Sequence, residues 1–337
     1  TVAGINEPDM MEDVIKNNRA DLILMGRGLI CEPEMPNKLA AGRYADCNRC
    51  LRCNECHNRL FAKNWFLCTL NPEVGFEGRM PLPAAPEKQK KVLIVGAGPG
   101  GMMAAWTAAK RGHQVILCDK GAELGGAIRF ADHVYFKRDM AYWRHQMENR
   151  LADSNVDVRL NTAVDADYVN QIRPDVLIIA VGADPARPPI PGLDNPKVIV
   201  GATMHYAPQN YGNKVVVIGG GLIGCETGYW LADTGHQVHV LEMREDLAMD
   251  ALPSHRAALL PRMAKTMTWN CSVTVTEVTE NGVKFTSQDG QEHFLEADTV
   301  LYAVGQRANS KTVEELKGAC DWFVAVGDCV RARQVKQ

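Results

Sequence analysis

Cysteine is the residue type whose spacing in this sequence is most informative. Five of the 11 cysteines lie within a stretch of 22 residues that begins at Cys47. Three of them, Cys50, Cys53 and Cys56, form a C-x-x-C-x-x-C loop, and Cys68 follows later in the sequence. Four thiolates in this arrangement can hold a cubane iron–sulfur cluster or a tetrahedral zinc ion. Cys47 also permits a ligand register one step earlier, and His57 is a further candidate ligand.

Two glycine-rich stretches repeat one pattern later in the chain. Each contains an apolar run, a G-x-G-x-x-G turn, a helix-like stretch ending at a glycine, a second apolar run and an acid. In both copies the acid follows the first glycine by 23 residues. The first copy contains Gly96, Gly98, Gly101 and Asp119, and the second contains Gly219, Gly221, Gly224 and Glu242.

This pattern predicts a β-α-β unit that binds a dinucleotide. The first glycine permits a tight turn, the second lets the backbone approach a pyrophosphate, and the third lets the helix pack on the strand. The acid accepts hydrogen bonds from ribose hydroxyls, so two copies predict two dinucleotides. Glu242 favours NAD(H), because a carboxylate repels the 2′-phosphate of NADP(H), although Arg244 leaves NADP(H) open.

The composition excludes several other classes of protein. The 337 residues contain 37 Lys plus Arg and 40 Asp plus Glu, so neither nucleic acid nor a membrane surface is an expected partner. No apolar run approaches the ~18 residues of a membrane span, and the first 19 residues have no signal-peptide layout. Clustered rather than dispersed cysteines indicate a reducing compartment, so we expect a cytoplasmic protein.

Three further motifs extend the glycine loops into a family resemblance. They are Val176–Pro185 (VLIIAVGADP), Val300–Arg307 (VLYAVGQR) and Val324–Asp328 (VAVGD). With them, the chain from Lys91 onward resembles the glutathione-reductase-like flavoproteins. The resemblance implies FAD on the first loop, with Asp328 contacting the ribityl chain, and a nicotinamide nucleotide on the second. The redox cysteine pair of disulfide-reducing members is missing, because Cys118 and Cys225 have no neighbouring cysteine.

The cysteine segment makes the resemblance more specific. A C-x-x-C-x-x-C…C-x-x-N-P segment ahead of a Pro-rich linker is similar to the iron–sulfur flavoenzymes of the old-yellow-enzyme type, such as 2,4-dienoyl-CoA reductase, 2-enoate reductase, bile-acid enoate oxidoreductases and trimethylamine dehydrogenase. That family carries FMN and substrate on an N-terminal (β/α)₈ barrel. The resemblance implies that Gly26 and Arg27 hold the FMN phosphate and that a [4Fe-4S] cluster is bound by Cys50, Cys53, Cys56 and Cys68, with Cys47 as an extra cysteine.

The implied fold class is α/β, with two Rossmann-like dinucleotide-binding domains preceded by the tail of a (β/α)₈ barrel and an iron–sulfur loop. Near the N-terminus, periodicity predicts a helix over Glu7–Asn18 and a strand over Asp21–Met25. We expect a protein about twice as long, with its catalytic residues in the absent part of the barrel. The predicted segments are 1–45 (barrel tail), 46–90 (iron–sulfur segment and linker), 91–200 (FAD domain), 201–307 (NAD(H) domain) and 308–337 (return to the FAD domain).

The implied activity is electron transfer from NADH through FAD and the cluster to FMN, with reduction of an activated C=C bond. The substrate would be a small molecule, either an unsaturated acid or an acyl-CoA. Two alternatives are an amine dehydrogenase or demethylase of the trimethylamine dehydrogenase type, and a non-catalytic electron-transfer module resembling the NADPH-side subunits of glutamate synthase. The intact second glycine loop favours the NADH-driven reaction, and a homo-oligomer is compatible with the sequence.

Overall fold

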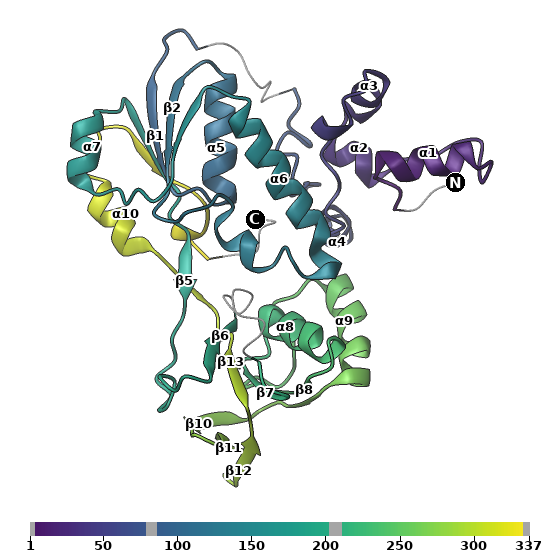
Figure 1. Cartoon of the computed structure of the whole chain (residues 1–337), viewed down its shortest axis with the longest axis vertical. Helices are drawn as coiled ribbons and strands as arrows, with labels where there is room; N and C mark the ends of the chain where they lie inside the picture. The colour runs from purple at the N-terminus through teal and green to yellow at the C-terminus, as the bar shows by residue number, and fades with distance from the viewer. Residues whose placement is uncertain (1–3, 79–85, 202–210, 333–337) are drawn as a thin grey trace. The chain divides into compact units, whose positions relative to one another are not determined.

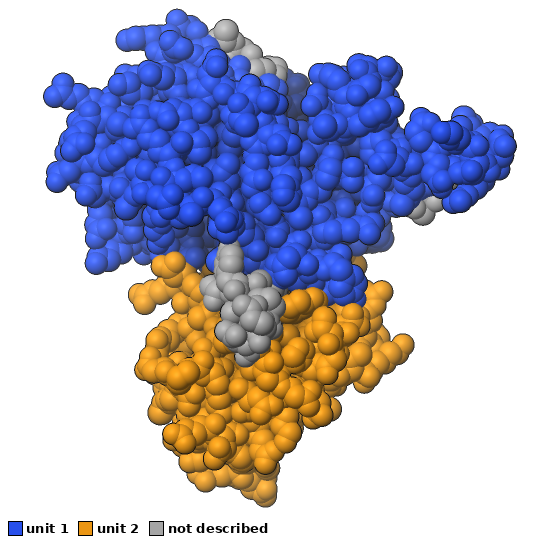
Figure 2. Space-filling view, viewed as in Figure 1, with its two compact units in different colours: residues 1–183, 308–337 blue, residues 184–307 orange. Residues whose placement is uncertain are grey.

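The computed structural model describes residues 4–78, 86–201 and 211–332. The chain divides into two compact units, Thr1–Ala183 with Ala308–Gln337, and Asp184–Arg307 (Figure 2). The boundaries fall within two short strands that pair with each other, β5 (Ala183–Pro185) and β14 (Gln306–Ala308). In the part of the chain that the structure describes, no helix is both long and apolar enough to cross a membrane.

The first unit is built on a five-stranded parallel sheet in the order β15-β4-β1-β2-β3. Its strands are β1 (Lys91–Val95), β2 (Gln114–Cys118), β3 (Val156–Arg159), β4 (Val176–Ile179) and β15 (Phe323–Ala325). The central strands are runs of Val, Ile and Leu because helices cover both faces of the sheet.

Helices α5 (Pro99–Lys110) and α6 (Arg138–Ala152) pack on one face of this sheet, while α7 (Ala166–Ile172) and α10 (Ser310–Leu316) cover the other (Figure 1). Alternate residues of each strand therefore enter different cores. The short 3₁₀ helices of this unit after β2 and β15 are η2 (Gly126–Phe130), η3 (Tyr135–Lys137) and η6 (Gly327–Cys329).

The second unit repeats the arrangement with a parallel sheet in the order β6-β13-β7-β8-β9. Its strands are β6 (Val198–Val200), β7 (Lys214–Ile218), β8 (Gln237–Leu241), β9 (Thr268–Asn270) and β13 (Thr299–Tyr302). Helices α8 (Leu222–Asp233) and α9 (Pro253–Thr266) cover one face. The other face packs against an antiparallel sheet of β10 (Thr274–Val278), β11 (Gly282–Thr286) and β12 (Glu292–Glu296).

Four strands of the two parallel sheets follow the same order, with β1 corresponding to β7, β2 to β8, β3 to β9 and β4 to β13, while the outer strand comes last in the first unit (β15) and first in the second (β6). A glycine turn and a helix follow the central strand in both units. This confirms the predicted α/β fold with two Rossmann-like units. The segment boundaries drawn from the sequence, and the assignment of residues 1–45 to a barrel tail, stay predictions.

The N-terminal part of the first unit is helical and irregular. It contains α1 (Pro8–Lys16), α2 (Arg27–Cys31), α3 (Met35–Ala40), η1 (Tyr44–Asp46) and α4 (Glu55–Phe61). The predicted first helix is confirmed as α1. The strand predicted over Asp21–Met25 is wrong, since only an isolated bridge at Leu24 forms there. Leu22 and Leu24 are 79% and 68% exposed while Ile23 and Met25 pack against Met11 and Met35, so only one face of this run is covered, whereas a buried strand is covered on both. Residues 79–85 of the Pro-rich linker lie outside the described residues.

Candidate functional site

The first glycine loop connects β1 to α5 and depends on the absence of side chains. Gly96 has φ +103°, and a Cβ atom there would overlap the carbonyl oxygen of Ala180. A Cβ atom on Gly101 would overlap the carbonyl oxygen of Gly96, which holds the helix close to the strand end. Gly98 is extended and is the N-cap residue of α5. The glycines thus have the positions that a tight turn and close helix packing require.

Asp119 follows β2 and lies beside this loop. Its Oδ2 accepts a hydrogen bond of 2.6 Å from the backbone N–H of Ala97, and its Oδ1 accepts one of 2.7 Å from the N–H of Gly121. Each carboxylate oxygen retains a second lone pair for a ribose hydroxyl. The predicted acid is therefore held at the edge of the predicted dinucleotide site.

The closing motif of the chain lies next to the same loop. Val326 donates a backbone hydrogen bond of 2.9 Å to the carbonyl of Ile179, at the end of β4. A Cβ atom on Gly100 would be 3.9 Å from Cγ2 of Val326. Asp328, two residues later in η6, thus belongs to the carboxyl edge of the first sheet, where open α/β sheets bind ligands.

The second glycine loop reproduces these contacts. Gly219 also has φ +103°, and a Cβ atom there would overlap the carbonyl of Ala303, while one on Gly224 would overlap Gly219. Gly221 is the N-cap residue of α8. Glu242 is 4% exposed and accepts hydrogen bonds from the backbone N–H groups of Gly220 and, at 2.7 Å, Arg244. The acid therefore holds the loop in the same way as in the first copy.

A small pocket opens at the same edge of the second sheet. Its lining is mostly apolar and comes from the ends of β6 and β13, the start of α8 and the segment around β14. The lining residues are Pro185, Ala186, Val200, Ile223, Tyr302, Ala303, Val304, Gly305 and Gln306. A dinucleotide held at the glycine loop would extend along this edge of the sheet.

The predicted cluster cysteines lie near one another in the first unit. All four are free and partly buried. Burial raises the pKa of the Cys50 and Cys56 thiols, and the proximity of Cys53 and Cys68 raises both further. In residues 4–78, 86–201 and 211–332, no three or more Cys, His, Asp or Glu side chains form a ready metal site.

The chemistry of this donor set suits an iron–sulfur cluster. The backbone N–H of Arg52 lies 3.4 Å from the sulfur of Cys50. Backbone N–H groups of Leu70 and Asn71 favour the thiolate of Cys68. Backbone N–H groups thus face two of the four predicted ligand sulfurs, and such hydrogen bonds tune the potential of an iron–sulfur cluster. Arg52 and Asn54 have positive φ values of 55° and 58°, so the loop curls tightly between the cysteines.

The guanidinium of Arg27 contacts the cysteine loop. Its Nη1 donates a hydrogen bond to Oδ1 of Asn54, the N-cap residue of α4. Its positive charge counteracts the pKa rise that burial causes at Cys50 and Cys56. The residue predicted to hold the FMN phosphate thus also lies beside the predicted cluster ligands, which the sequence did not indicate.

Cys31 is a second residue that sequence reasoning missed, because its isolated position indicated only a small buried hydrophobe. It is 2% exposed and hydrogen-bonds the thiol of Cys68, and this contact lowers the pKa of Cys68. Cys47 has different surroundings. Its sulfur lies 3.7 Å from the carbonyl of Arg43, and its side chain packs with Met11 and Met35.

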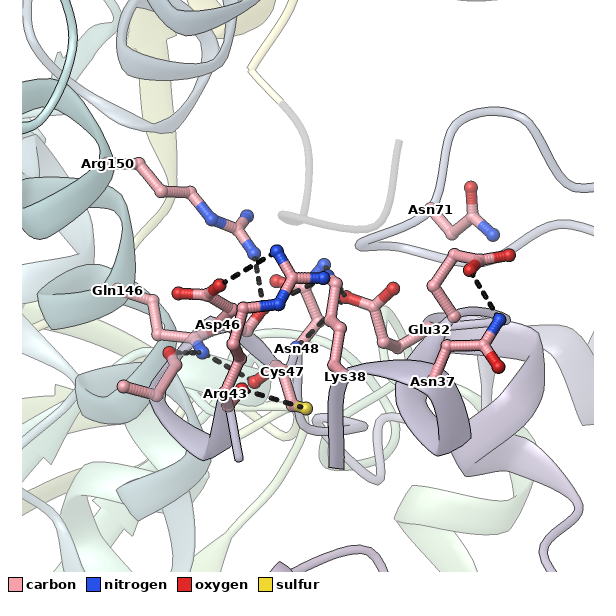
Figure 3. Close-up of polar contacts among 12 residues, drawn as sticks. Glu32, Asn37, Lys38, Arg43, Asp46, Cys47, Asn48, Asn71, Gln146 and Arg150 are labelled. Atoms are coloured by element: carbon pink, nitrogen blue, oxygen red, sulfur yellow. Dashed lines mark hydrogen bonds and ion pairs between the residues drawn. The ribbon is translucent and has the colours of Figure 1, made fainter. Parts of the chain in front are cut away.

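Polar contacts fix the cysteine segment to helix α6 (Figure 3). Gln146 donates hydrogen bonds to the carbonyls of Ala45, at 2.7 Å, and Cys47. Arg150 donates to the carbonyl of Asp46 at 3.2 Å. The buried Glu32 accepts from Lys38 at 2.7 Å and from Asn48 at 3.2 Å. The segment is thereby part of the same unit as the first glycine loop.

Comparison with protein families places this architecture among known proteins. The family described as pyridine nucleotide-disulphide oxidoreductase matches residues 90–328. The chain belongs to this family. Its match spans both glycine loops and ends at Asp328, so the family relation covers the two Rossmann-like units and leaves out the cysteine segment.

Several relatives match nearly the whole chain. The NADH oxidase of Thermoanaerobacter brockii is 38% identical over 314 residues, which are 91% of this chain and 48% of that protein. The bilirubin reductase of Mediterraneibacter gnavus is 34% identical over 98% of this chain and 51% of its own. A solved 2-naphthoyl-CoA reductase complex superposes with a TM-score of 0.93 at 31% identity, over 99% of this chain and 51% of that one.

The chain therefore spans about half the length of the relatives it matches. Their similarity extends through the cysteine segment, because coverage of 98% or more includes residues upstream of Lys91. These relatives confirm the resemblance to the iron–sulfur flavoenzymes of the old-yellow-enzyme type.

Proposed function

We propose that the whole protein is an NADH-dependent iron–sulfur flavin oxidoreductase that reduces an activated C=C bond of an enoyl-CoA or enoate. The observation that carries this proposal is that the cysteine segment and the first glycine loop lie in one compact unit, in which α6 bonds residues 45–47 and packs against α5. The reductase and oxidase names of the relatives support this chemistry. The amine dehydrogenase alternative is not favoured.

The two glycine loops would hold the two dinucleotides. Gly96, Gly98 and Gly101 would let the FAD pyrophosphate approach the start of α5, while Asp119 binds a ribose hydroxyl and Asp328 the ribityl chain. When bound, FAD supplies the conversion of a hydride from NADH into single electrons. Residues of this unit would fix the position of the flavin and exclude water.

The second loop would hold NAD(H) in the same way. Gly219, Gly221 and Gly224 would receive the pyrophosphate, and the buried Glu242 would accept the 2′-hydroxyl of the adenosine ribose. The nicotinamide end would extend along the carboxyl edge of the second sheet, past Ile223 and Val304.

The cysteine loop would hold a [4Fe-4S] cluster through Cys50, Cys53, Cys56 and Cys68. A cluster at this place supplies a one-electron centre between two flavins. Gly26 and Arg27 would hold the phosphate of FMN on a (β/α)₈ barrel, which would also supply the residues that contact the substrate.

Cofactor stoichiometry after anaerobic purification of this chain tests the proposal. We expect about four iron and four labile sulfide per chain and FAD release on boiling, given one cubane cluster and one intact FAD loop. The variant Cys56→Ala should lose the iron, whereas Cys271→Ala, in the second unit, should keep it. About one zinc per chain, or folded protein without flavin, would contradict the proposal.

A further inference from the structure

The two glycine loops differ in what lies against the start of the following helix. In the first copy the helix begins with Pro99, which has no N–H to donate. In the second copy Leu222 takes this position, and its N–H donates a hydrogen bond of 2.8 Å to Oδ1 of Asp250. The second loop thus contains an additional donor, and a carboxylate occupies it.

Backbone contacts show which residues correspond between the copies. Gly125 donates a hydrogen bond of 2.9 Å to the carbonyl of Ala97, and Ala248 donates one of 2.7 Å to the carbonyl of Gly220. By this correspondence Asp250 is equivalent to Ala127. The first copy therefore presents Gly125, Gly126 and Ala127 at the loop, without charge, whereas the second presents an acid.

The carboxylate of Asp250 lies where a pyrophosphate would approach. Its two oxygens are 3.5 and 3.6 Å from the position that a Cβ atom on Gly221 would have. Gly221 corresponds to the glycine whose missing side chain lets a pyrophosphate approach the backbone. The free N–H groups at a helix N-terminus are the groups that bind such an anion. Asp250 and a dinucleotide would therefore compete for the same space and the same donor.

We propose that Asp250 is a specificity-determining residue that occupies the pyrophosphate position of the second loop and weakens dinucleotide binding there. This inference rests on the proposed assignment of the second loop to NAD(H). A bound pyrophosphate displaces the carboxylate from Leu222 and remains close to its negative charge. The first loop carries no such competitor, so the flavin nucleotide is held tightly while the nicotinamide nucleotide exchanges.

Binding measurements on the full chain test this role. Calorimetry with NAD⁺ and with ADP-ribose would compare the wild type with Asp250→Asn, which keeps an oxygen acceptor but removes the charge. We expect the variant to bind both ligands about tenfold more tightly, with a gain that shrinks as the salt concentration rises. Adenosine, which has no phosphate, should bind both proteins equally.

A matched control is Asp246→Asn. Asp246 is 54% exposed and pairs with Arg256 rather than with the glycine loop, so its variant should leave all three dissociation constants within about twofold. If the wild type binds NAD⁺ and Asp250→Asn binds it no more tightly, the inference about Asp250 is wrong, while the NAD(H) assignment stands. Absence of binding by both proteins at millimolar ligand would overturn the NAD(H) assignment and the inference with it. Lower thermal stability of Asp250→Asn at unchanged affinity would reduce Asp250 to a helix cap.

Discussion

Replacing Glu242 by Gln separates the structural role of this acid from its proposed role in coenzyme choice. The buried carboxylate accepts backbone N–H groups of Gly220 and Arg244, one on each oxygen. An amide accepts only one of them and directs its NH₂ group at the other, which costs about 1–3 kcal/mol. The melting temperature should fall by about 2–4 °C for each kcal/mol lost.

The coenzyme effect has a separate magnitude. A hydrogen bond from the ribose 2′-hydroxyl to a charged acceptor contributes about 1.5–3 kcal/mol, so Glu242→Gln should weaken NADH binding about 10- to 150-fold. The affinity for NADPH should rise relative to that for NADH, because the charge that repels the 2′-phosphate is gone.

The assay is the dissociation constant of each coenzyme, measured by fluorescence alongside a thermal melt. Glu245→Gln, at an exposed neighbouring position, is the control and should change neither quantity. If Glu242→Gln lowers the melting temperature but leaves the NADH to NADPH ratio unchanged, the acid only holds the loop and the reasoning fails.

Three further predictions concern the first loop, the cysteine loop and pH. Gly101→Ala should yield protein without flavin, because the added Cβ atom overlaps the carbonyl of Gly96. Gly100→Ala should keep FAD, because its Cβ atom has Cγ2 of Val326 as nearest neighbour, at 3.9 Å. Equal flavin content in the two variants would refute this prediction. Arg27→Gln should lower the reduction potential of the cluster, followed in an EPR-monitored titration, by on the order of 60 mV, the one-electron equivalent of about 1.4 kcal/mol, because a positive charge beside the cysteines is removed. Arg27→Lys, which retains the charge, should keep a potential close to that of the wild type. An unchanged potential in Arg27→Gln at full iron content would count against the role of Arg27. Burial lowers the pKa of His239 in the folded protein. As the pH falls below ~6.5, the unfolded chain therefore binds a proton more readily than the folded chain does. The stability that neutral His239 contributes is thus complete above pH ~6.5 and is lost progressively below it. Urea unfolding of His239→Gln should show less of this loss between pH 7 and 5, and an identical pH profile would exclude the histidine as its source.

The sequence predicted those features that a local stretch of backbone determines. Gly96 must adopt a positive φ beside Ala180, and Asp119 must reach the turn. A short sequence pattern is therefore enough to predict the turn and the acid that binds it. The repeat of the pattern at Gly219 and Glu242 made the shared topology of the two units predictable as well.

Features that depend on distant neighbours were not predictable in this way. The contact of Arg27 with Asn54 and that of Cys31 with Cys68 join residues 27 and 37 positions apart. The strand predicted over Asp21–Met25 was wrong because a strand exists only with a partner, and an apolar run does not reveal whether one is present.

The most direct test of the central claim is a stepwise anaerobic titration of the purified chain with NADH, followed by visible absorption and EPR. We expect bleaching of the flavin band, followed by a paramagnetic signal from the reduced cluster, with about one NADH needed per two electrons taken up. Protein that contains FAD and iron but whose spectra do not change on adding NADH would show that the chain does not pass electrons from NADH to the cluster.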